Sequence, residues 1–368
     1  MRYSPQLLRL ILTCGGGSLV LSTSVLLAQG PTSNRVEVRD KKDGSTKVLN
    51  GKLTLSKSGL QLVASDKKAT LLNYEDIVRI EPGELPDVDR FTFKAAFNAE
   101  EKKTTKDLES ARSIYSDLLK KAKDPTARRH LEYRLALNST RLADLEADGP
   151  KWKELVEAAL KEWENFLITH TSGWEVWPAA RTASRLYVEL GRYDMAARLW
   201  AGLVKLPDLP ADLQLEAAIQ QVDALFRNKD YAAAASALDA ALKQAKPGNA
   251  RDRLELYKLA VEKARQGLSP DTISNLTQEI EKQLEKYTDP AVRATAFSIR
   301  GEIYRQDPQR LREAMWAYLW VETVYNVDKY EVHKASVRLV EIFQTLKDEE
   351  RTQLQRERLR QLRDSLLM

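Results

Sequence analysis

The fold is decided by residues 174–247, where two similar segments follow each other: 177-WPAARTASRLYVELGRYDMAARLWAGLVKLP-207 and 215-LEAAIQQVDALFRNKDYAAAASALDAALKQAKP-247. Each segment carries apolar residues at helical spacing on both sides of a short turn. Three pairs of equivalent positions lie 38 residues apart, namely Tyr193 and Tyr231, Ala196 and Ala234, and Trp200 and Leu238. An internal repeat of this length predicts two consecutive helical hairpins that stack on one another.

Helix start signals extend this organisation over residues 91–368. Asp or Ser accepts hydrogen bonds from the free amides of a first helical turn, and proline at the next position needs no amide partner. Such pairs occur at Asp124-Pro125, Ser269-Pro270, Asp289-Pro290 and Asp307-Pro308. We therefore expect a helical array of seven hairpins. Their ranges are 91–123, 125–170, 174–207, 210–246, 250–288, 290–326 and 330–367.

Most of the second helices contain a small residue followed four positions later by a bulky one, which places both on one helix face. The pairs are Ala111/Tyr115, Ala159/Trp163, Ala196/Trp200, Ala234/Leu238 and Ala314/Tyr318. We expect the alanine to allow close helix approach and the bulky side chain to fill the gap between hairpins. The last helix, residues 349–367, is expected to cap the array with its leucine-bearing face. A basic helix that binds anionic lipid or a partner is the alternative.

The hairpins resemble the tetratricopeptide repeat, a helix–turn–helix unit that stacks into a solenoid. The resemblance is best over residues 177–247 and partial over residues 294–326. In the first hairpin the signature positions are occupied by Gly191, Tyr193, Ala196 and Trp200. The tryptophan and leucine of the repeat's first helix are missing, since Ala180 and Ala183 stand there. The resemblance implies an α-solenoid that acts as a non-catalytic binding scaffold.

The resemblance also implies a binding face, because the first helix of each hairpin lines the concave side of such an array. The positions concerned here are Arg181, Arg185, Glu189, Asp223, Phe226 and Arg227. Arg181 and Arg185 would suit a carboxylate or an acidic segment. Arg181, Arg185 and Glu189 stand four residues apart, so a solvated stripe with an intrahelical ion pair is the alternative.

Residues 34–83 have a different periodicity, with short apolar runs of period two. Turn-forming pairs separate the runs, at Asp43-Gly44, Asn50-Gly51, Ser58-Gly59 and Ser65-Asp66. This pattern predicts about five antiparallel strands in a small all-β domain that resembles an SH3-like or Sm-like barrel in layout. Residues 84–90 are expected to form a linker. Lysine pairs at 41–42 and 67–68 are expected to protect edge strands rather than to bind nucleic acid, because no aromatic residues interleave them.

Residues 1–30 are predicted to be a signal peptide. Arg2 and Arg9 precede an apolar stretch, residues 10–28, that ends in small residues, so cleavage is expected after Ala28 or Gly30. An uncleaved anchor helix and a lipoprotein modified at Cys14 are the alternatives. Each of these three interpretations places the rest of the chain in the periplasm or cell envelope.

Composition and motifs narrow the classes of function. The 58 Lys+Arg against 53 Asp+Glu give a net charge of +5, a mixed surface that favours no nucleic-acid partner. Cys14 is the single cysteine, and the three histidines form no short ligand motif, so we expect no metal or other cofactor. The sequence has no nucleotide loop, nucleophile elbow or His-Glu-x-x-His motif, and we expect no enzyme activity.

Two tryptophan pairs have helical spacing, Trp174 with Trp177 and Trp316 with Trp320. We expect both pairs to lie in the core or between repeats, because aromatic residues at this spacing usually pack there. A platform for carbohydrate or another ligand is the alternative.

These observations predict an exported bacterial scaffold for protein–protein interaction or assembly in the cell envelope. Its partner would be a protein or peptide that the sequence does not identify, with no nucleic acid and with membrane contact only through an N-terminal anchor. One alternative is a glycan- or peptidoglycan-associated binding factor, or an accessory subunit of an envelope enzyme. Another is a cytoplasmic nucleic-acid-binding protein, which would require the signal-peptide interpretation to be wrong.

Overall fold

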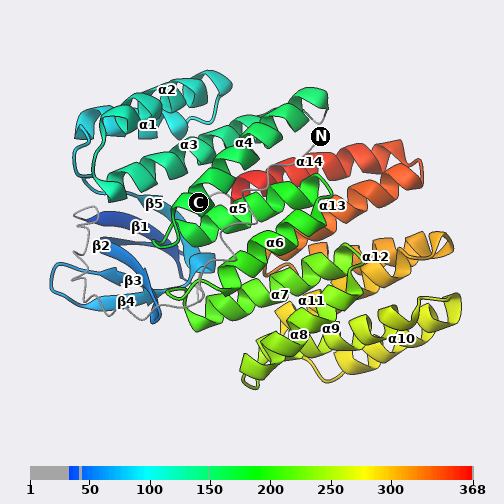
Figure 1. Ribbon diagram of the computed structural model, residues 1–368. Coiled ribbons are helices and arrows are strands. Elements are labelled where there is room, and N and C mark those ends of the chain that lie inside the picture. The colour runs from blue at the N-terminus through cyan, green and yellow to red at the C-terminus, as the bar shows by residue number, and fades with distance from the viewer. Residues whose placement is uncertain (1–32, 41–43, 148, 367–368) are drawn as a thin grey trace, which may run out of the picture.

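The computed structural model describes residues 33–40, 44–147 and 149–366. In this part of the chain, five strands come first and fourteen α-helices follow, and Figure 1 shows the sheet lying at one side of the helical array. The predicted signal peptide and Cys14 lie outside the described residues. None of the described helices is both long enough and apolar enough to cross a membrane.

The strands form one antiparallel sheet in the order β4-β3-β2-β1-β5. Their bounds are β1 Asn34–Arg39, β2 Thr46–Ser56, β3 Gly59–Val63, β4 Ala69–Leu72 and β5 Ile77–Glu81, with a short 3₁₀ helix, η2, at Tyr74–Asp76. The expectation of five antiparallel strands is confirmed. β5 follows η2 and returns to pair with β1 at the edge of the sheet.

The predicted turn at Asn50-Gly51 is wrong, because both residues lie within the long strand β2. Strand β2 pairs with β1 up to Gly51 and with β3 from Lys52 onward. A Cβ atom on Gly51 would lie 2.5 Å from the carbonyl oxygen of Val63. The glycine is therefore needed for the close approach of β3 where β2 changes partners, and not for a turn.

The helices form the seven expected hairpins. Their bounds are α1 Arg90–Glu100, α2 Thr105–Lys121, α3 Pro125–Leu145, α4 Pro150–Thr169, α5 Val176–Glu189, α6 Tyr193–Val204, α7 Ala211–Arg227, α8 Tyr231–Gln244, α9 Asn249–Gln266, α10 Pro270–Leu284, α11 Pro290–Tyr304, α12 Leu311–Thr323, α13 Lys329–Thr345 and α14 Glu349–Leu366. Asp124, Ser269 and Asp289 each accept hydrogen bonds from amides of the first turn of their helix. Asp307 does the same for the 3₁₀ helix η3 (Pro308–Arg310), which leads into α12.

The predicted pairs of small and bulky residues lie between the helices as expected. All ten side chains are buried, with none more than 2% exposed. Trp163 and Trp200 also donate hydrogen bonds from Nε1, to Thr140 Oγ1 and Ser184 Oγ. These bonds satisfy the single polar atom of each ring, so a large aromatic side chain is accommodated between hairpins without an unpaired donor.

Gly301 on α11 lies directly against the ring of Tyr318 on α12. A Cβ atom at position 301 would lie 2.5 Å from the Tyr318 ring. We expect Gly301→Ala to lower the free energy of unfolding by about 1–3 kcal/mol, because overpacking of a filled core forces side chains and backbone to shift. Urea denaturation measures this change. Gly202→Ala in α6 is the control, since nothing lies within 4 Å of its added Cβ; equal destabilisation by both changes would contradict the packing argument.

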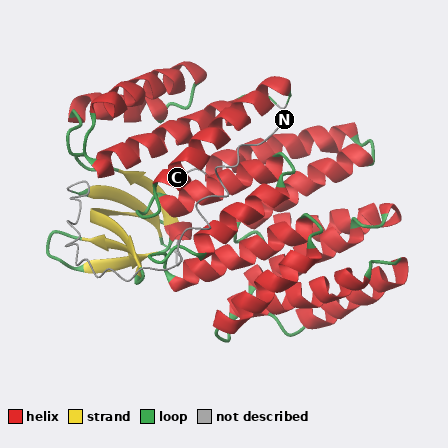
Figure 2. Cartoon of the chain, viewed as in Figure 1, coloured by secondary structure: helices red, strands yellow, loops and turns green. Residues whose placement is uncertain are grey.

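The sheet and the helices share one hydrophobic core. Val36, Leu53 and Ile80 from the strands belong to the same buried cluster as Trp163 and Trp177 from the helices. The hydroxyl of Tyr74, in η2, donates a hydrogen bond of 2.8 Å to the carbonyl of Trp174. Figure 2 shows the strands gathered at one side of the helices. The sheet is therefore held in a fixed position against the helices.

The last hairpin returns to the first half of the array. Helix α13 packs against α5, and α14 packs against α3; Figure 1 shows both beside α5 although more than 100 residues separate them in sequence. Every residue from Tyr330 to Leu339 is buried, so this part of α13 is enclosed on all sides. In α14, Leu359 and Arg363 are buried whereas Leu354 is exposed. The expected leucine face is therefore only partly correct, and α14 covers neighbouring helices with a mixed face.

Candidate functional site

The residues expected to line an open concave face are mostly covered. Arg185, Asp223, Phe226 and Arg227 are buried, and the side chain of Glu189 is only 2% exposed. The charged residues among them share one side of α5 and α7. That side faces α13 and α14, and the polar groups of these residues are engaged by partners within the chain. Their role in binding another molecule stays a prediction.

Glu189, at the end of α5, joins three helices. Its carboxylate lies 2.9 Å from Arg185 on its own helix, 2.7 Å from His333 Nε2 on α13 and 2.7 Å from Arg363 on α14. Arg185 also donates two hydrogen bonds, of 3.0 and 2.9 Å, to the two oxygens of Asp144 on α3. Burial alone would raise the pKa of Glu189, but Arg363 and Arg185 outweigh it and hold the pKa well below its ordinary value.

Asp223 on α7 stands 38 residues after Arg185, at the equivalent position of the repeat. It accepts hydrogen bonds from Arg227 at 2.8 Å and from the Tyr257 hydroxyl at 2.7 Å. The ammonium group of Lys334 on α13 lies 2.7 Å from Asp223 and 2.8 Å from Glu331. Opposed by burial, Arg227 and Lys334 lower the pKa of Asp223, so the carboxylate stays charged in the interior.

Phe226 and Glu302 complete this region. The Phe226 ring packs between Tyr231 and Tyr257, with centroids 5.6 and 6.0 Å away, so it is a core residue. Glu302 on α11 accepts hydrogen bonds from Arg227 and from Arg338 on α13, each at 2.7 Å. The side of α5, α7 and α11 that was expected to be concave is thus filled by α13, which is held through charged groups at several points along its length.

Sequence reasoning missed the residues of α13 that carry this contact. They are Tyr330, Glu331, His333, Lys334 and Arg338. Their mixture of charged and apolar residues is typical of a helix with one solvated face. Only the burial of α13 on all sides reveals that these charges have partners on distant helices, because those partners lie more than 100 residues away in sequence for Lys334.

Arg181 is the one expected residue that lies beside open space. Its guanidinium donates hydrogen bonds to Glu75 of η2 and, at 3.3 Å, to Asp328 before α13. It also lies over the Tyr330 ring, 5.4 Å from the centroid. Two cavities, of about 300 and 350 Å³, adjoin this bridge on the two sides of Arg181 and Glu75. We call the second of them the mouth cavity, because it lies where the concave side meets the sheet.

The mouth cavity combines aromatic walls with carboxylates. Among the described residues that line it, the aromatic ones are Tyr74, Trp177, Trp200 and Tyr330, and the charged ones are Glu75, Arg181, Asp212, Glu216 and Asp328. Burial raises the pKa of Asp328 to about 6; Arg181 opposes the shift, whereas the nearby Glu75, Glu331 and Glu216 add to it. The negative charge around the cavity therefore exceeds what Arg181 neutralises.

The raised pKa of Asp328 predicts a pH dependence of stability. The pKa of Asp328 in the folded protein, about 6, lies above the ordinary value of 3.8. Protonation of Asp328 therefore stabilises the folded state below pH 4, and this stabilisation is lost as pH rises through 6. Asp328→Asn removes this loss and keeps the hydrogen bond to the Tyr330 amide that begins α13. We expect the free energy of unfolding of the variant, relative to that of the native protein, to rise by at most about 3 kcal/mol between pH 4 and 7.

Urea unfolding of both proteins at pH 4, 5, 6 and 7 checks this expectation. A stability difference between variant and native protein that stays constant over this range, or that falls with pH, would show that Asp328 titrates normally in the folded state.

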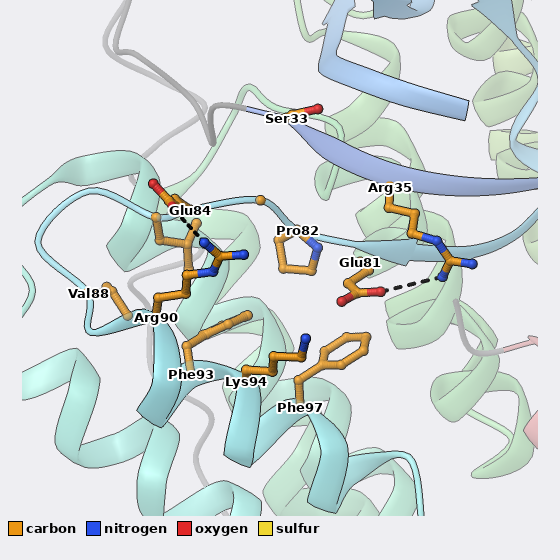
Figure 3. Close-up of a pocket in the computed structure, with 12 residues that line it drawn as sticks. Ser33, Arg35, Glu81, Pro82, Glu84, Val88, Arg90, Phe93, Lys94 and Phe97 are labelled. Carbon is orange, nitrogen blue, oxygen red and sulfur yellow. Dashed lines mark hydrogen bonds and ion pairs between the residues drawn. The ribbon is translucent and has the colours of Figure 1, made fainter. Parts of the chain in front are cut away.

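A further hollow of about 370 Å³ lies between the sheet and α1, as Figure 3 shows. Phe93 and Phe97 form its apolar side, and Lys94 projects between them (Figure 3). Ion pairs at its rim join Arg35 to Glu81 and Arg90 to Glu84; the rim charges are therefore largely balanced within the chain. The hollow contains none of the residues expected to bind, and we do not assign it a ligand.

The two tryptophan pairs differ in burial. Trp174 and Trp177 are buried in the core, as expected. For Trp316 and Trp320 the expectation is wrong, because they are 61% and 43% exposed on α12. The Trp320 ring stacks on Phe297 at 5.5 Å and lies 6.0 Å from Tyr325, nearly parallel to both. These tryptophans face outward because the inner face of α12 is already filled by Ala314 and Tyr318.

Within the described residues, no group of three or more His, Cys, Asp or Glu side chains is placed to hold a metal ion.

The fold and the site together define the class of the protein. It is a mainly helical protein of consecutive hairpins, with fourteen helices of the described chain paired behind a five-stranded antiparallel sheet.

The sequence matches no protein-family model, and it matches no curated protein. Among solved structures, the chain is similar to a tetratricopeptide repeat protein from Parabacteroides merdae ATCC 43184, with 16% sequence identity and a TM-score of 0.39. That alignment covers 76% of this chain and 98% of the other.

Proposed function

We propose that the protein is a non-catalytic scaffold for protein–protein interaction in the bacterial cell envelope, and that a partner segment binds at the mouth cavity. One observation carries the proposal: α13 fills the concave side of the array, and the mouth cavity is an open remainder of that side. Such a cavity, with apolar walls and a few polar groups, is the usual form of a binding site.

The position of the mouth cavity favours a protein segment as its occupant. Glu75 comes from the sheet, Trp177 from α5, Asp212 from α7 and Tyr330 from α13. A segment bound there would contact four elements that are far apart in the sequence and already fixed by a shared core. Rigid elements reduce the entropy lost on binding, so a small contact surface can still be specific.

The envelope location rests on the predicted signal peptide. Intact-mass analysis of the protein from fractionated cells of its native host tests it. A periplasmic species that begins after Ala28 or Gly30 is expected, whereas a cytoplasmic species that retains residues 1–30 would contradict an envelope role.

Capture of partners from an envelope extract tests the scaffold itself. The native protein is compared with two variants. Asp212→Lys changes an exposed residue that lines the mouth cavity, and Asp239→Lys changes an exposed residue on α8 and serves as the control. We expect the native chain and the control to capture the same proteins in similar amounts. The Asp212→Lys chain is expected to capture at least about tenfold less of these proteins, as for loss of a central contact. Identical captured proteins for all three chains would contradict binding at the mouth cavity.

Glycan binding is the second candidate function, and the exposure of Trp316 and Trp320 favours it. Exposed indole faces provide apolar surface for a sugar ring, and the guanidinium of Arg300 lies beside the same aromatic group, 5.4 Å from the Phe297 centroid. Titration with peptidoglycan fragments while tryptophan fluorescence is recorded tests this function. Quenching that Trp316→Ala abolishes would support a glycan-associated role, and an unchanged spectrum at millimolar fragment would exclude these ligands.

A further inference from the structure

We infer that the mouth cavity receives the side chain of a lysine or arginine from the partner segment. This inference rests on the proposed function and adds the chemical class of the bound group. Four features support it: the balance of charge, a buried acceptor beside the cavity, the cations that the chain itself places there, and the size and walls of the cavity.

The balance of charge at the cavity is negative. Among the described residues that line it, four are acidic, Glu75, Asp212, Glu216 and Asp328, and Arg181 is the one basic residue. Glu216 has a further partner in Arg253, at 2.7 Å, but Glu75 and Asp328 share Arg181. An added cation would therefore be attracted by carboxylates that the chain neutralises only in part.

A buried acceptor beside the cavity points the same way. Oε1 of Glu331 accepts a hydrogen bond of 3.1 Å from Gln220, which lines the cavity. Oε2 of Glu331 is buried and has no hydrogen-bond partner among the described residues. An unsatisfied buried carboxylate oxygen is costly, and a donor group that enters beside Gln220 would reduce that cost.

The chain already places cations in these surroundings. The Tyr330 ring has the guanidinium of Arg181 at 5.4 Å from its centroid and the ammonium of Lys334 at 5.2 Å. Both cations also have carboxylate partners, Asp328 for Arg181 and Asp223 for Lys334. An aromatic ring with a carboxylate nearby is a favourable site for a guanidinium or ammonium group.

The size and the walls of the cavity suit one long side chain. Its volume of about 350 Å³ lies at the lower end of the range for ligand pockets. Leu213, which is half-buried, and Val327, which is exposed, provide apolar surface for the methylene stem of lysine or arginine, while the carboxylates receive the charged head. An acidic segment, which Arg181 and Arg185 suggest from sequence alone, fits less well, because Arg185 is buried and Arg181 already has two carboxylate partners.

Peptide binding to the full chain tests the inference. The probe is acetyl-Gly-Arg-Gly-amide, compared with the same peptide carrying citrulline, which has the shape of arginine without its charge. Binding is followed by chemical shifts of the Trp177 and Trp200 indole groups. We expect millimolar binding of the arginine peptide that shifts these two groups, at least about tenfold weaker binding of the citrulline peptide, and weaker binding at 0.5 M salt.

Asp212→Asn provides the matched variant, because Asp212 is exposed and its change does not disturb the core. We expect it to weaken the arginine peptide several-fold, and Asp239→Asn on α8 to leave it unchanged. Equal binding of the arginine and citrulline peptides, or indole shifts that are absent with both, would overturn the inference. If Asp212→Lys nevertheless loses the partner from envelope extract, the scaffold stands and only the cationic ligand is excluded.

Discussion

Replacing Lys334 by methionine is expected to lower the free energy of unfolding by about 3–5 kcal/mol, the usual cost of removing one partner from a buried ion pair. Lys334 is 1% exposed and its ammonium group contacts Asp223 at 2.7 Å, Glu331 at 2.8 Å and Gln220 at 3.0 Å. Methionine keeps most of the side-chain volume, so the change removes the charge and leaves two buried carboxylates without it.

Urea denaturation at pH 7 measures this loss. Lys258→Met on α9 is the matched control, because Lys258 is exposed and its replacement is expected to change stability by less than about 0.5 kcal/mol. A Lys334→Met protein as stable as the control would show that Lys334 is solvated and that α13 does not fill the concave side.

Glu302→Gln is expected to be similarly damaging at pH 7, by about 3–5 kcal/mol. The carboxylate holds Arg227 and Arg338 at 2.7 Å and accepts a hydrogen bond from the Tyr318 hydroxyl at 2.7 Å. Glutamine has nearly the same shape but cannot neutralise the two guanidinium groups, which would remain buried. The cost arises from these unpaired charges more than from the lost hydrogen bonds.

The effect of Glu302→Gln is expected to depend on pH. Opposed by burial, Arg338 and Arg227 lower the pKa of Glu302 from 4.5 to about 2. Stability from this group is present above the unfolded pKa and is lost as pH falls through the folded pKa. The difference between native protein and variant should therefore shrink from pH 5 to pH 2, whereas the exposed control Glu279→Gln on α10 should show little difference at any pH. A constant difference would contradict the assignment.

The hairpins could be predicted because their signals are local. Asp124, Ser269 and Asp289 each act on amides two or three residues away, and each alanine and its bulky partner lie on one helical turn. The five strands were also predictable, from period-two runs. The predicted turn at Asn50-Gly51 was wrong, because an Asn-Gly pair has two uses. It favours a hairpin turn, and its glycine also allows a neighbouring strand to approach a long strand closely.

The site was less predictable because its contacts are not local. Arg185, Glu189, Asp223 and Arg227 lie on the side of α5 and α7 that faces α13, but their spacing in the sequence does not tell what covers that side. The cover is α13, whose Lys334 reaches Asp223 over 111 residues. Trp316 and Trp320 show the same limit, because helical spacing places them together but does not decide which face of α12 is buried.

A double-mutant cycle between Asp223 and Lys334 tests the central claim most directly, namely that the C-terminal hairpin occupies the concave side of its own array. The free energy of unfolding is measured for the native chain, Asp223→Asn, Lys334→Met and the double variant. We predict a coupling free energy of at least about 1 kcal/mol, as for residues in one buried ion-pair network. A coupling within about 0.3 kcal/mol of zero, the value for residues that do not touch, would contradict the claim.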